Sequence, residues 1–82
     1  MVFVYMVECA DGSLYTGWTV DVERRVATHN SGRGAYYTSI RRPVKLVYVE
    51  ECASRSLAQK REVVIKKLSR AKKLELIGRS RD

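Results

Sequence analysis

The sequence predicts an α+β domain in which a three-stranded antiparallel sheet is flanked by helices, in the order β-β-α-β-α-α. Two β-branched and aromatic runs, residues 2–7 and 13–18, enclose the turn sequence Ala-Asp-Gly. Segments 21–31 and 56–77 place apolar residues at helical spacing, and an alternating strand pattern lies between them. With 82 residues and no internal repeat or linker, we expect one domain, residues 1–82.

The first two strands form a hairpin whose loop length decides where two tyrosines lie. A two-residue Asp11-Gly12 turn would place Tyr5 and Tyr15 on opposite faces of the sheet. A three-residue loop that also includes Ala10, with Gly12 in the left-handed region, would place both tyrosines on the same face. Both registers remain open at this point.

The first helix is predicted over Asp21–Ser31, with Thr19 or Asp21 as N-cap and Gly32 just past its end. Val22, Val26 and His29 share one face, and Arg25 lies on the same side, whereas Arg24 points the other way. Only Arg25 is therefore directed toward whatever this helix packs on. A lone histidine on an apolar face is more often a hydrogen-bonded core residue than a catalyst.

A polar segment, Arg33–Arg42, precedes the third strand and reads "RGAYYTSIRR". Basic residues interleaved with aromatic residues suit contacts to phosphates and bases, but the same segment is also consistent with a long loop held by its own tyrosines. Pro43 stops any helix here, and Val44–Glu50 alternates as a strand.

A second helix is predicted to open with the capping box Ser56 to Gln59, and Ser69 can cap a further helix from Arg70 to Ile77. Glu62 lies at the edge of the apolar stripe, which predicts a half-buried carboxylate. The predicted stripe consists of Leu57, Val64, Ile65 and Leu68.

Charge is distributed unevenly along the chain. The net charge is +7, and residues 53–74 hold eight Lys or Arg but one acid, Glu62. Such a basic face indicates a polyanion, most often nucleic acid, or else a solvated helix surface. The longest apolar runs have strand length, so we expect no membrane segment, and without a signal-peptide pattern we expect a cytoplasmic protein. Cys9 and Cys52 have no metal-ligand spacing and are expected to be reduced thiols.

Five residues and their spacing resemble a known family, the GIY-YIG nuclease domain: Tyr5, the "YTG" of residues 15–17, Arg25, His29 and Glu62. The resemblance covers essentially the whole chain and looks closest to small single-domain bacterial members, in which phrases like "CADGSLYTG", "DVERR", "HNSG" and "LSRAKK" are typical. The first signature reads Phe-Val-Tyr in place of Gly-Ile-Tyr, and the second reads Tyr-Thr-Gly in place of Tyr-Ile-Gly.

The resemblance implies a metal-dependent endonuclease that hydrolyses DNA phosphodiester bonds. Glu62 would hold Mg²⁺ or Mn²⁺, bound weakly without substrate, and Arg25 would grip the scissile phosphate. Tyr5, Tyr15 and His29 would share the activation of water, and the general base among them stays open. In a purely structural alternative, Arg25 and Glu62 pair with each other.

The expected partner is nucleic acid, DNA above all, with no membrane and no obligate protein partner. The residues expected to contact it are Gly17, Arg33, Tyr37, Arg41, Arg42 and Lys66. Gly17, considered alone, fits a strand bulge equally well. Two further functions stay open: a nucleic-acid-binding module without turnover, and a protein-interaction domain that exposes Trp18 and Tyr36.

Overall fold

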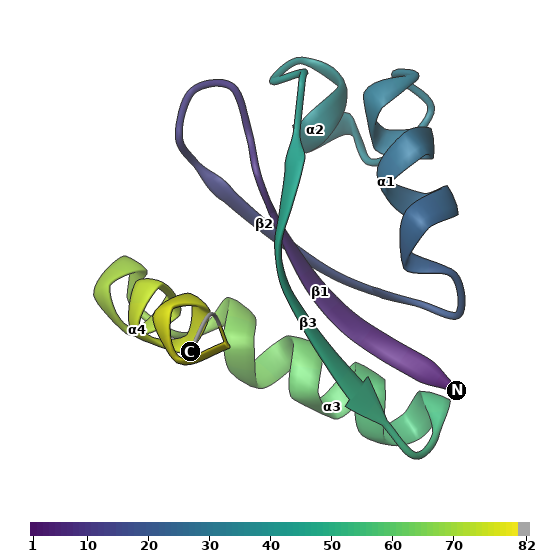
Figure 1. The fold of residues 1–82 in the computed structure, drawn as a ribbon, viewed down its shortest axis with the longest axis vertical. Helices are drawn as coiled ribbons and strands as arrows, with labels where there is room; N and C mark the ends of the chain where they lie inside the picture. The colour runs from purple at the N-terminus through teal and green to yellow at the C-terminus, as the bar shows by residue number, and fades with distance from the viewer. Residues whose placement is uncertain (81–82) are drawn as a thin grey trace.

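The computed structural model describes residues 1–80 and contains three strands and four helices (Figure 1). The sheet is three-stranded and antiparallel, as predicted. Its central strand β1 pairs with both β2 and β3, in the order β2-β1-β3. One element was missed, because the segment predicted as a loop contains the short helix α2. The elements are β1 Val2–Glu8, β2 Leu14–Thr19, α1 Val22–Asn30, α2 Tyr36–Ser39, β3 Lys45–Cys52, α3 Arg55–Lys66 and α4 Arg70–Ser80.

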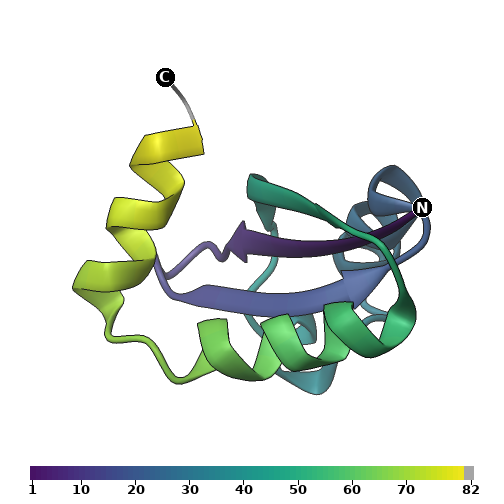
Figure 2. The ribbon, with the colours of Figure 1, turned by 90° about the horizontal axis from the view of Figure 1, so that it is seen from below.

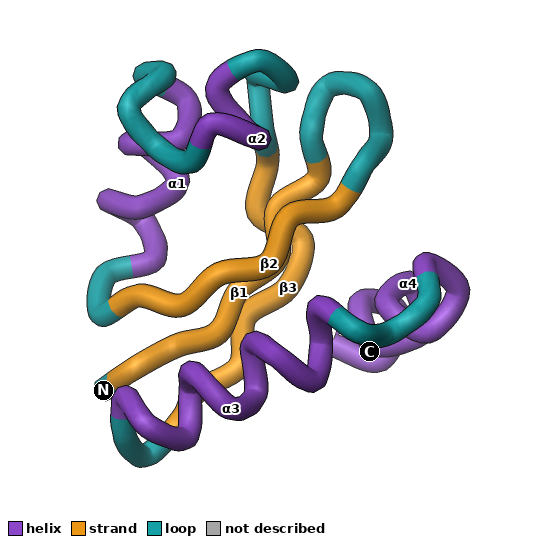
Figure 3. The backbone as a smooth tube through the Cα atoms, turned by 180° about the vertical axis from the view of Figure 1, so that it is seen from behind, coloured by secondary structure: helices purple, strands orange, loops and turns teal. Residues whose placement is uncertain are grey.

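The sheet buries both of its faces against helices (Figure 2). Because side chains alternate along a strand, Val4 and Met6 of β1 point to α3 and α4, where they pack with Ala58, Ile65 and Ile77. The intervening residues of β1 point to the other face, where Val26 of α1 packs against them. Helices α1 and α3 therefore lie on opposite sides of the sheet, and both flank β2 (Figure 3).

The hairpin adopts the three-residue loop. Cys9 N donates to Ser13 O at 2.8 Å, and Gly12 has a φ of 85°, a left-handed conformation that glycine adopts readily. In the resulting register Tyr5 lies opposite Gly17 and Val7 lies opposite Tyr15. Residues directly opposite each other share a face, so Tyr5 and Tyr15 are on the same side of the sheet.

Side-chain caps fix where three of the helices begin. Asp21 caps α1 by accepting a hydrogen bond from Arg24 N at 3.1 Å, and Ser69 Oγ accepts one from Lys72 N at 3.2 Å at the start of α4. Helix α3 begins earlier than predicted, because Ser54 rather than Ser56 is the cap and accepts from Leu57 N at 3.2 Å. Ser54 has the extended backbone of an N-cap, whereas Ser56 already lies in the first turn.

The buried face of α3 also differs from the predicted stripe. Ala58 and Ile65 are fully buried, but Leu57 and Val64 are each 50% exposed. Glu62 lies half-buried beside this face, as predicted. The other differences are in element ends: β3 runs to Cys52, and α4 continues to Ser80. Among the helices of residues 1–80, none has the length and apolar character that crossing a membrane requires.

Candidate functional site

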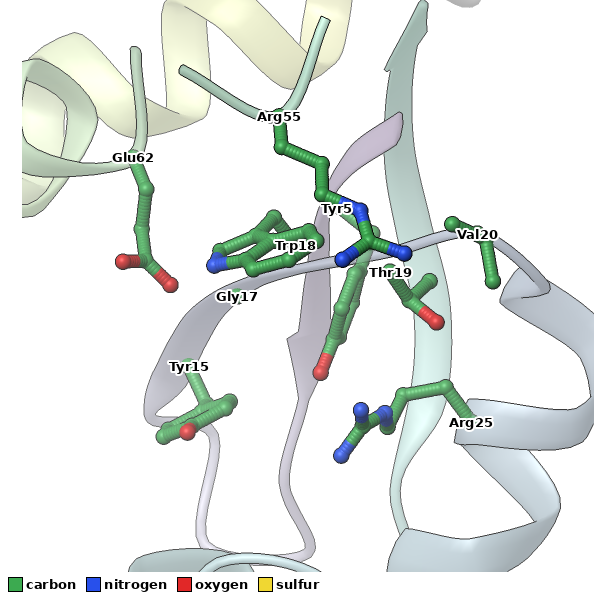
Figure 4. A pocket seen from close by; sticks show the side chains of 9 residues that line it. All are labelled: Tyr5, Tyr15, Gly17, Trp18, Thr19, Val20, Arg25, Arg55 and Glu62. Atoms are coloured by element: carbon green, nitrogen blue, oxygen red, sulfur yellow. The ribbon is translucent and has the colours of Figure 1, made fainter. Parts of the chain in front are cut away.

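A pocket of about 420 Å³ opens beside β2, between α1 and α3 (Figure 4). Four of the five predicted catalytic residues line it, and each comes from a different element: Tyr5 from β1, Tyr15 from β2, Arg25 from α1 and Glu62 from α3. Arg25 and Glu62 point into the pocket from opposite sides, with the Tyr5 hydroxyl between them (Figure 4). The lining is completed by Gly17, Trp18, Thr19, Val20 and Arg55.

His29, the fifth predicted residue, lies behind Tyr5 and does not line the pocket. It is 1% exposed, and its Nε2 is 2.7 Å from the Tyr5 hydroxyl. Its ring also makes a T-shaped contact with the ring of Tyr15, with ring centroids 5.3 Å apart. His29 therefore contacts the pocket indirectly, through the two tyrosines that line it, and its shortest contact is with the hydroxyl of Tyr5.

Burial sets the protonation of these three side chains. It raises the pKa of Tyr5 well above the usual value for tyrosine, and the neighbouring Tyr15 raises this pKa further. Burial likewise raises the pKa of Tyr15, with a smaller contribution from Glu62. Burial and then the Arg25 cation lower the pKa of His29. At neutral pH both hydroxyls hold their protons and the imidazole is neutral, so His29 is the proton acceptor of this group.

Arg25 offers an unpaired guanidinium at the mouth of the pocket. Its side chain is exposed, and it forms no hydrogen bond or ion pair with any residue between 1 and 80. The predicted alternative of an Arg25–Glu62 ion pair is not present. Arg24 is absent from the lining, in agreement with the predicted orientation of the two arginines. A free guanidinium is a strong site for a phosphate, because it can donate two parallel hydrogen bonds.

Glu62 has the character of a cation ligand. Its side chain is 20% exposed, and its one ion-pair partner within the described chain is Lys66, at 3.8 Å. Residues 1–80 contain no group of three or more His, Cys, Asp or Glu that could hold a metal ion. A cation held at Glu62 would therefore take its other ligands from water and from a phosphate, which is the arrangement magnesium tolerates best.

Gly17 makes room for Tyr5. A Cβ atom at position 17 would lie 2.6 Å from the Tyr5 hydroxyl oxygen and 2.9 Å from Cζ. The pairing between β1 and β2 continues through this position without a shift, so the strand-bulge alternative is wrong. The glycine is required because the Tyr5 ring crosses directly over it.

Three of the predicted nucleic-acid contacts gather around Tyr15. Tyr37 stacks on Tyr15 with ring centroids 5.9 Å apart, and the Arg41 guanidinium lies 3.9 Å from the centre of the Tyr37 ring. Lys66 Nζ lies 5.8 Å from the centre of the Tyr15 ring. These side chains extend the pocket toward α2 as a row of aromatic and cationic groups.

The remaining two predicted contacts lie farther from the pocket. Arg42 links α2 to the end of α1, because its Nε donates to Ser39 O at 3.0 Å and its guanidinium also donates to Asn30 O at 3.4 Å. Arg33 is exposed. Arg41 has a structural contact as well, an ion pair with Asp11 at 3.1 Å.

The sequence analysis missed three residues that line the pocket, Thr19, Val20 and Arg55, and two residues that surround His29 behind it. Thr38 is fully buried in α2, and its Oγ1 lies 2.7 Å from His29 Nδ1. A side-chain carbon at Gly34 would overlap that same nitrogen, so Gly34 leaves the space that the imidazole fills. The glycine in "RGAYY" was a visible signal, but only the folded segment shows which side chain it accommodates.

The sequence profile of the GIY-YIG catalytic domain matches residues 1–75. The chain belongs to the GIY-YIG family. It is 57% identical over 76 residues to a UPF0213 protein of Staphylococcus saprophyticus, covering 93% of each chain. It is 59% identical to a UPF0213 protein of Syntrophus aciditrophicus, covering 92% of this chain and 87% of the relative.

Two solved structures have the same GIY-YIG fold. The solution structure of a UPF0213 protein from Bacillus halodurans matches with a TM-score of 0.60 and 47% identity, over 95% of this chain and 84% of the other. The solution structure of a protein from E. faecalis matches with a TM-score of 0.63 and 40% identity, over 96% and 84%. The resemblance drawn from the five residues is thus confirmed, and the chain has a nuclease-like fold from a family whose domains interact with nucleic acid.

Proposed function

We propose that this GIY-YIG domain is an endonuclease that hydrolyses DNA phosphodiester bonds in the cytoplasm with Mg²⁺ or Mn²⁺. The observation that carries the proposal is the pocket itself, where an unpaired guanidinium, a partly exposed carboxylate and a tyrosine hydroxyl backed by a neutral histidine face one space. The net charge of +7 supports a polyanionic substrate.

The charged side chains divide the work of stabilising the transition state. Arg25 binds a non-bridging oxygen of the scissile phosphate and neutralises the charge that accumulates there. Glu62 would hold the cation from the opposite wall of the pocket. When bound, that cation would act as a Lewis acid toward the phosphoryl oxygens and the departing alkoxide.

The proton of the attacking water follows the hydrogen bond at the back of the pocket. Tyr5 faces the water, and its hydroxyl lies within hydrogen-bond distance of His29 Nε2, at 2.7 Å. As the water attacks phosphorus, its proton passes to the Tyr5 oxygen while the proton of Tyr5 passes to His29, which becomes an imidazolium. Tyr5 therefore never needs to exist as a free phenolate, which its raised pKa disfavours. Tyr15 packs against His29 and borders the same space.

The DNA strand would extend from the pocket across Tyr15 toward α2. Tyr37 and Arg41 supply a stacked ring and a guanidinium there, and Lys66 adds a cation on the α3 side. This direction places the aromatic and basic groups along one continuous path that leads to the reactive centre.

A nucleic-acid-binding module without turnover is the second candidate. It is favoured by the ion pair between Lys66 and Glu62, which provides the carboxylate with a cation from the protein itself. The two functions share the basic surface and differ in whether Glu62 exchanges that lysine for a metal ion.

A cleavage assay on branched, single-stranded and duplex DNA, with Mg²⁺, with Mn²⁺ and with EDTA, separates the two. The nuclease predicts metal-dependent products from at least one substrate that disappear in Arg25→Ala. Binding that weakens steeply with salt but yields no product with either metal would leave the binding module as the function. A lack of binding at low salt would contradict both.

A further inference from the structure

We propose that Thr38 is a positioning residue that holds His29 in a single tautomer, with the proton on Nδ1 and the lone pair of Nε2 directed at the Tyr5 hydroxyl. The catalytic consequence of this arrangement rests on the proposed nuclease function. The tautomer itself is a property of the folded protein and is measurable without any DNA.

A count of protons along the hydrogen-bond chain carries the assignment. Thr38 Oγ1 is 2.9 Å from Ala35 O, a carbonyl that only accepts, so the hydroxyl proton of Thr38 is donated there. The Thr38 oxygen is then an acceptor toward His29, and Nδ1, 2.7 Å away, carries the proton. A neutral imidazole has one N–H, so Nε2 is left as the acceptor for the Tyr5 hydroxyl at 2.7 Å. Each of the three protons has an acceptor.

The reversed arrangement satisfies fewer groups. If Thr38 donated to Nδ1, then Nε2–H would donate to the Tyr5 oxygen, and the Tyr5 hydroxyl proton would have no acceptor among residues 1–80. That proton would have to go to solvent in the pocket, and the 2.9 Å contact between Thr38 Oγ1 and Ala35 O would be left without a proton between two acceptors. The contact with Ala35 thus favours the direction in which the hydrogen-bond chain ends on the Ala35 carbonyl.

The surrounding backbone fixes Thr38 in place. Thr38 is 0% exposed, and α2 is closed by the hydrogen bond from Ser39 N to Ala35 O at 3.0 Å. Gly34 allows the imidazole to approach this turn, because a side chain there would overlap Nδ1. The neighbouring residue Tyr37 stacks on Tyr15. The same turn of α2 therefore contacts His29 through Thr38 and the expected DNA path through Tyr37.

The chain has a single histidine, so its imidazole nitrogens are read without ambiguity by NMR of protein labelled with ¹⁵N histidine. The proposal predicts that wild type and Thr38→Ser show a protonated Nδ1 and an unprotonated Nε2 above the pKa of His29. Thr38→Val, which keeps the shape but removes the acceptor, should show exchange averaging or a shift toward the Nε2–H tautomer. Ser39→Ala is the matched control, because its hydroxyl makes the equivalent bond to Tyr36 O at 2.8 Å without touching His29.

Cleavage kinetics on the same proteins test the catalytic consequence. We expect kcat to fall by roughly 10- to 100-fold in Thr38→Val, by analogy with the loss of hydrogen-bond partners that orient metal-bound histidines, with DNA affinity unchanged. Thr38→Ser should retain most of the activity, and Ser39→Ala should resemble wild type.

A wild-type spectrum with the proton on Nε2 would overturn the proposal, even if Thr38→Val fails to fold. Equal spectra for wild type and a folded Thr38→Val would also overturn it. If the spectra follow the prediction but wild type cleaves no DNA, the nuclease function fails and the tautomer assignment stands.

Discussion

Substituting Gly17 with alanine tests the packing on which the Tyr5 geometry depends. The new Cβ would lie 2.6 Å from the Tyr5 oxygen. A carbon–oxygen contact needs about 3.3 Å, so the hydroxyl must retreat by roughly 0.7 Å. Because the Tyr5 hydroxyl is the atom closest to the new Cβ, this displacement should break or bend its 2.7 Å hydrogen bond to His29.

Two effects of opposite sign determine the change in unfolding free energy for Gly17→Ala. Forcing a methyl group into a packed site lowers stability by about 1–3 kcal/mol. The more restricted unfolded chain raises it by about 0.4–1 kcal/mol. We therefore expect a net loss of about 1–2 kcal/mol, or a melting temperature about 5–15 °C lower for a domain of this size.

The assay is urea denaturation together with cleavage kinetics, and Gly78→Ala is the matched control. Nothing lies within 4 Å of a Cβ at position 78, in the exposed part of α4, so alanine there should stabilise the protein by about 0.5–1 kcal/mol. Introducing Tyr5→Phe into Gly17→Ala should recover part of the lost stability, because it removes the closest atom. If Gly17→Ala is as stable and as active as wild type, our reading of the Tyr5 position is incorrect.

Three further predictions follow from the site and the core. Arg25→Ala should lower kcat by about 10²-fold or more, whereas Arg24→Ala should affect only DNA binding; equal losses in steady-state kinetics would mean that the two orientations are misassigned. Because the pKa of His29 is lowered in the fold, only the unfolded state gains its proton as the pH first falls below about 6.5, so the unfolding free energy should decline in that range. We expect kcat to stay level above about pH 7 and to decline only at more acid pH, where His29 of the folded protein also gains its proton. A kcat that keeps rising toward pH 10 would point instead to an ionised tyrosine. Ile65→Ala should lower the unfolding free energy in urea by about 2–5 kcal/mol, and Val64→Ala by less than about 1 kcal/mol, with the reverse order contradicting the assigned face of α3.

Several local features of the fold were predictable from the sequence, although the cap of α3 was not. Asp21 and Ser69 act as caps because their side chains bond to backbone groups three residues away, which needs no tertiary context. The hairpin was predictable up to a choice between two registers, and Gly12 in the left-handed region made the choice. The positions of Tyr5 and Tyr15 followed from that register alone.

The face of α3 was mispredicted because apolar residues surround much of this helix. Leu57, Val63 and Val64 are about as apolar as Ile65, so periodicity leaves two neighbouring arcs that could each meet the sheet. In the structure the buried arc is the one that contains Ala58 and Ile65, where the helix lies against β1 and β2. The side chains of the other arc are half-exposed. Steric fit to the sheet decided between the two arcs, and this fit cannot be inferred from the sequence of one helix.

The role of Thr38 could not be predicted because it depends on a contact between two helices, α1 and α2, whose residues His29 and Thr38 are nine positions apart. Polar residues in a segment such as "RGAYYTSIRR" have no periodicity, and the short α2 turn has too few residues to produce one. The resemblance identified His29 and four residues that line the pocket, but it did not indicate which side chain contacts His29 from the other side. That information appeared only when the segment was placed against α1.

The central claim is that Glu62 holds a catalytic cation, and Glu62→Gln tests it most directly. The ion pair with Lys66 is a partly exposed i,i+4 contact at 3.8 Å, so its loss should lower the unfolding free energy by about 0.5 kcal/mol or less. One preparation should be measured for melting temperature, for DNA affinity in EDTA and for cleavage with Mg²⁺ and Mn²⁺. The exposed Glu75→Gln in α4 removes the same charge from the basic half of the chain and serves as control.

The measurement that decides is the metal-dependent cleavage rate of folded Glu62→Gln, free of contaminating nuclease. We predict that cleavage falls by at least about 10²-fold, while the melting temperature is retained and DNA affinity in EDTA is unchanged or slightly tighter because a negative charge has left the surface. Glu75→Gln should cleave like wild type. Cleavage at the wild-type rate by Glu62→Gln would contradict the account, because no other carboxylate lines the pocket within the part of the chain that the structure describes.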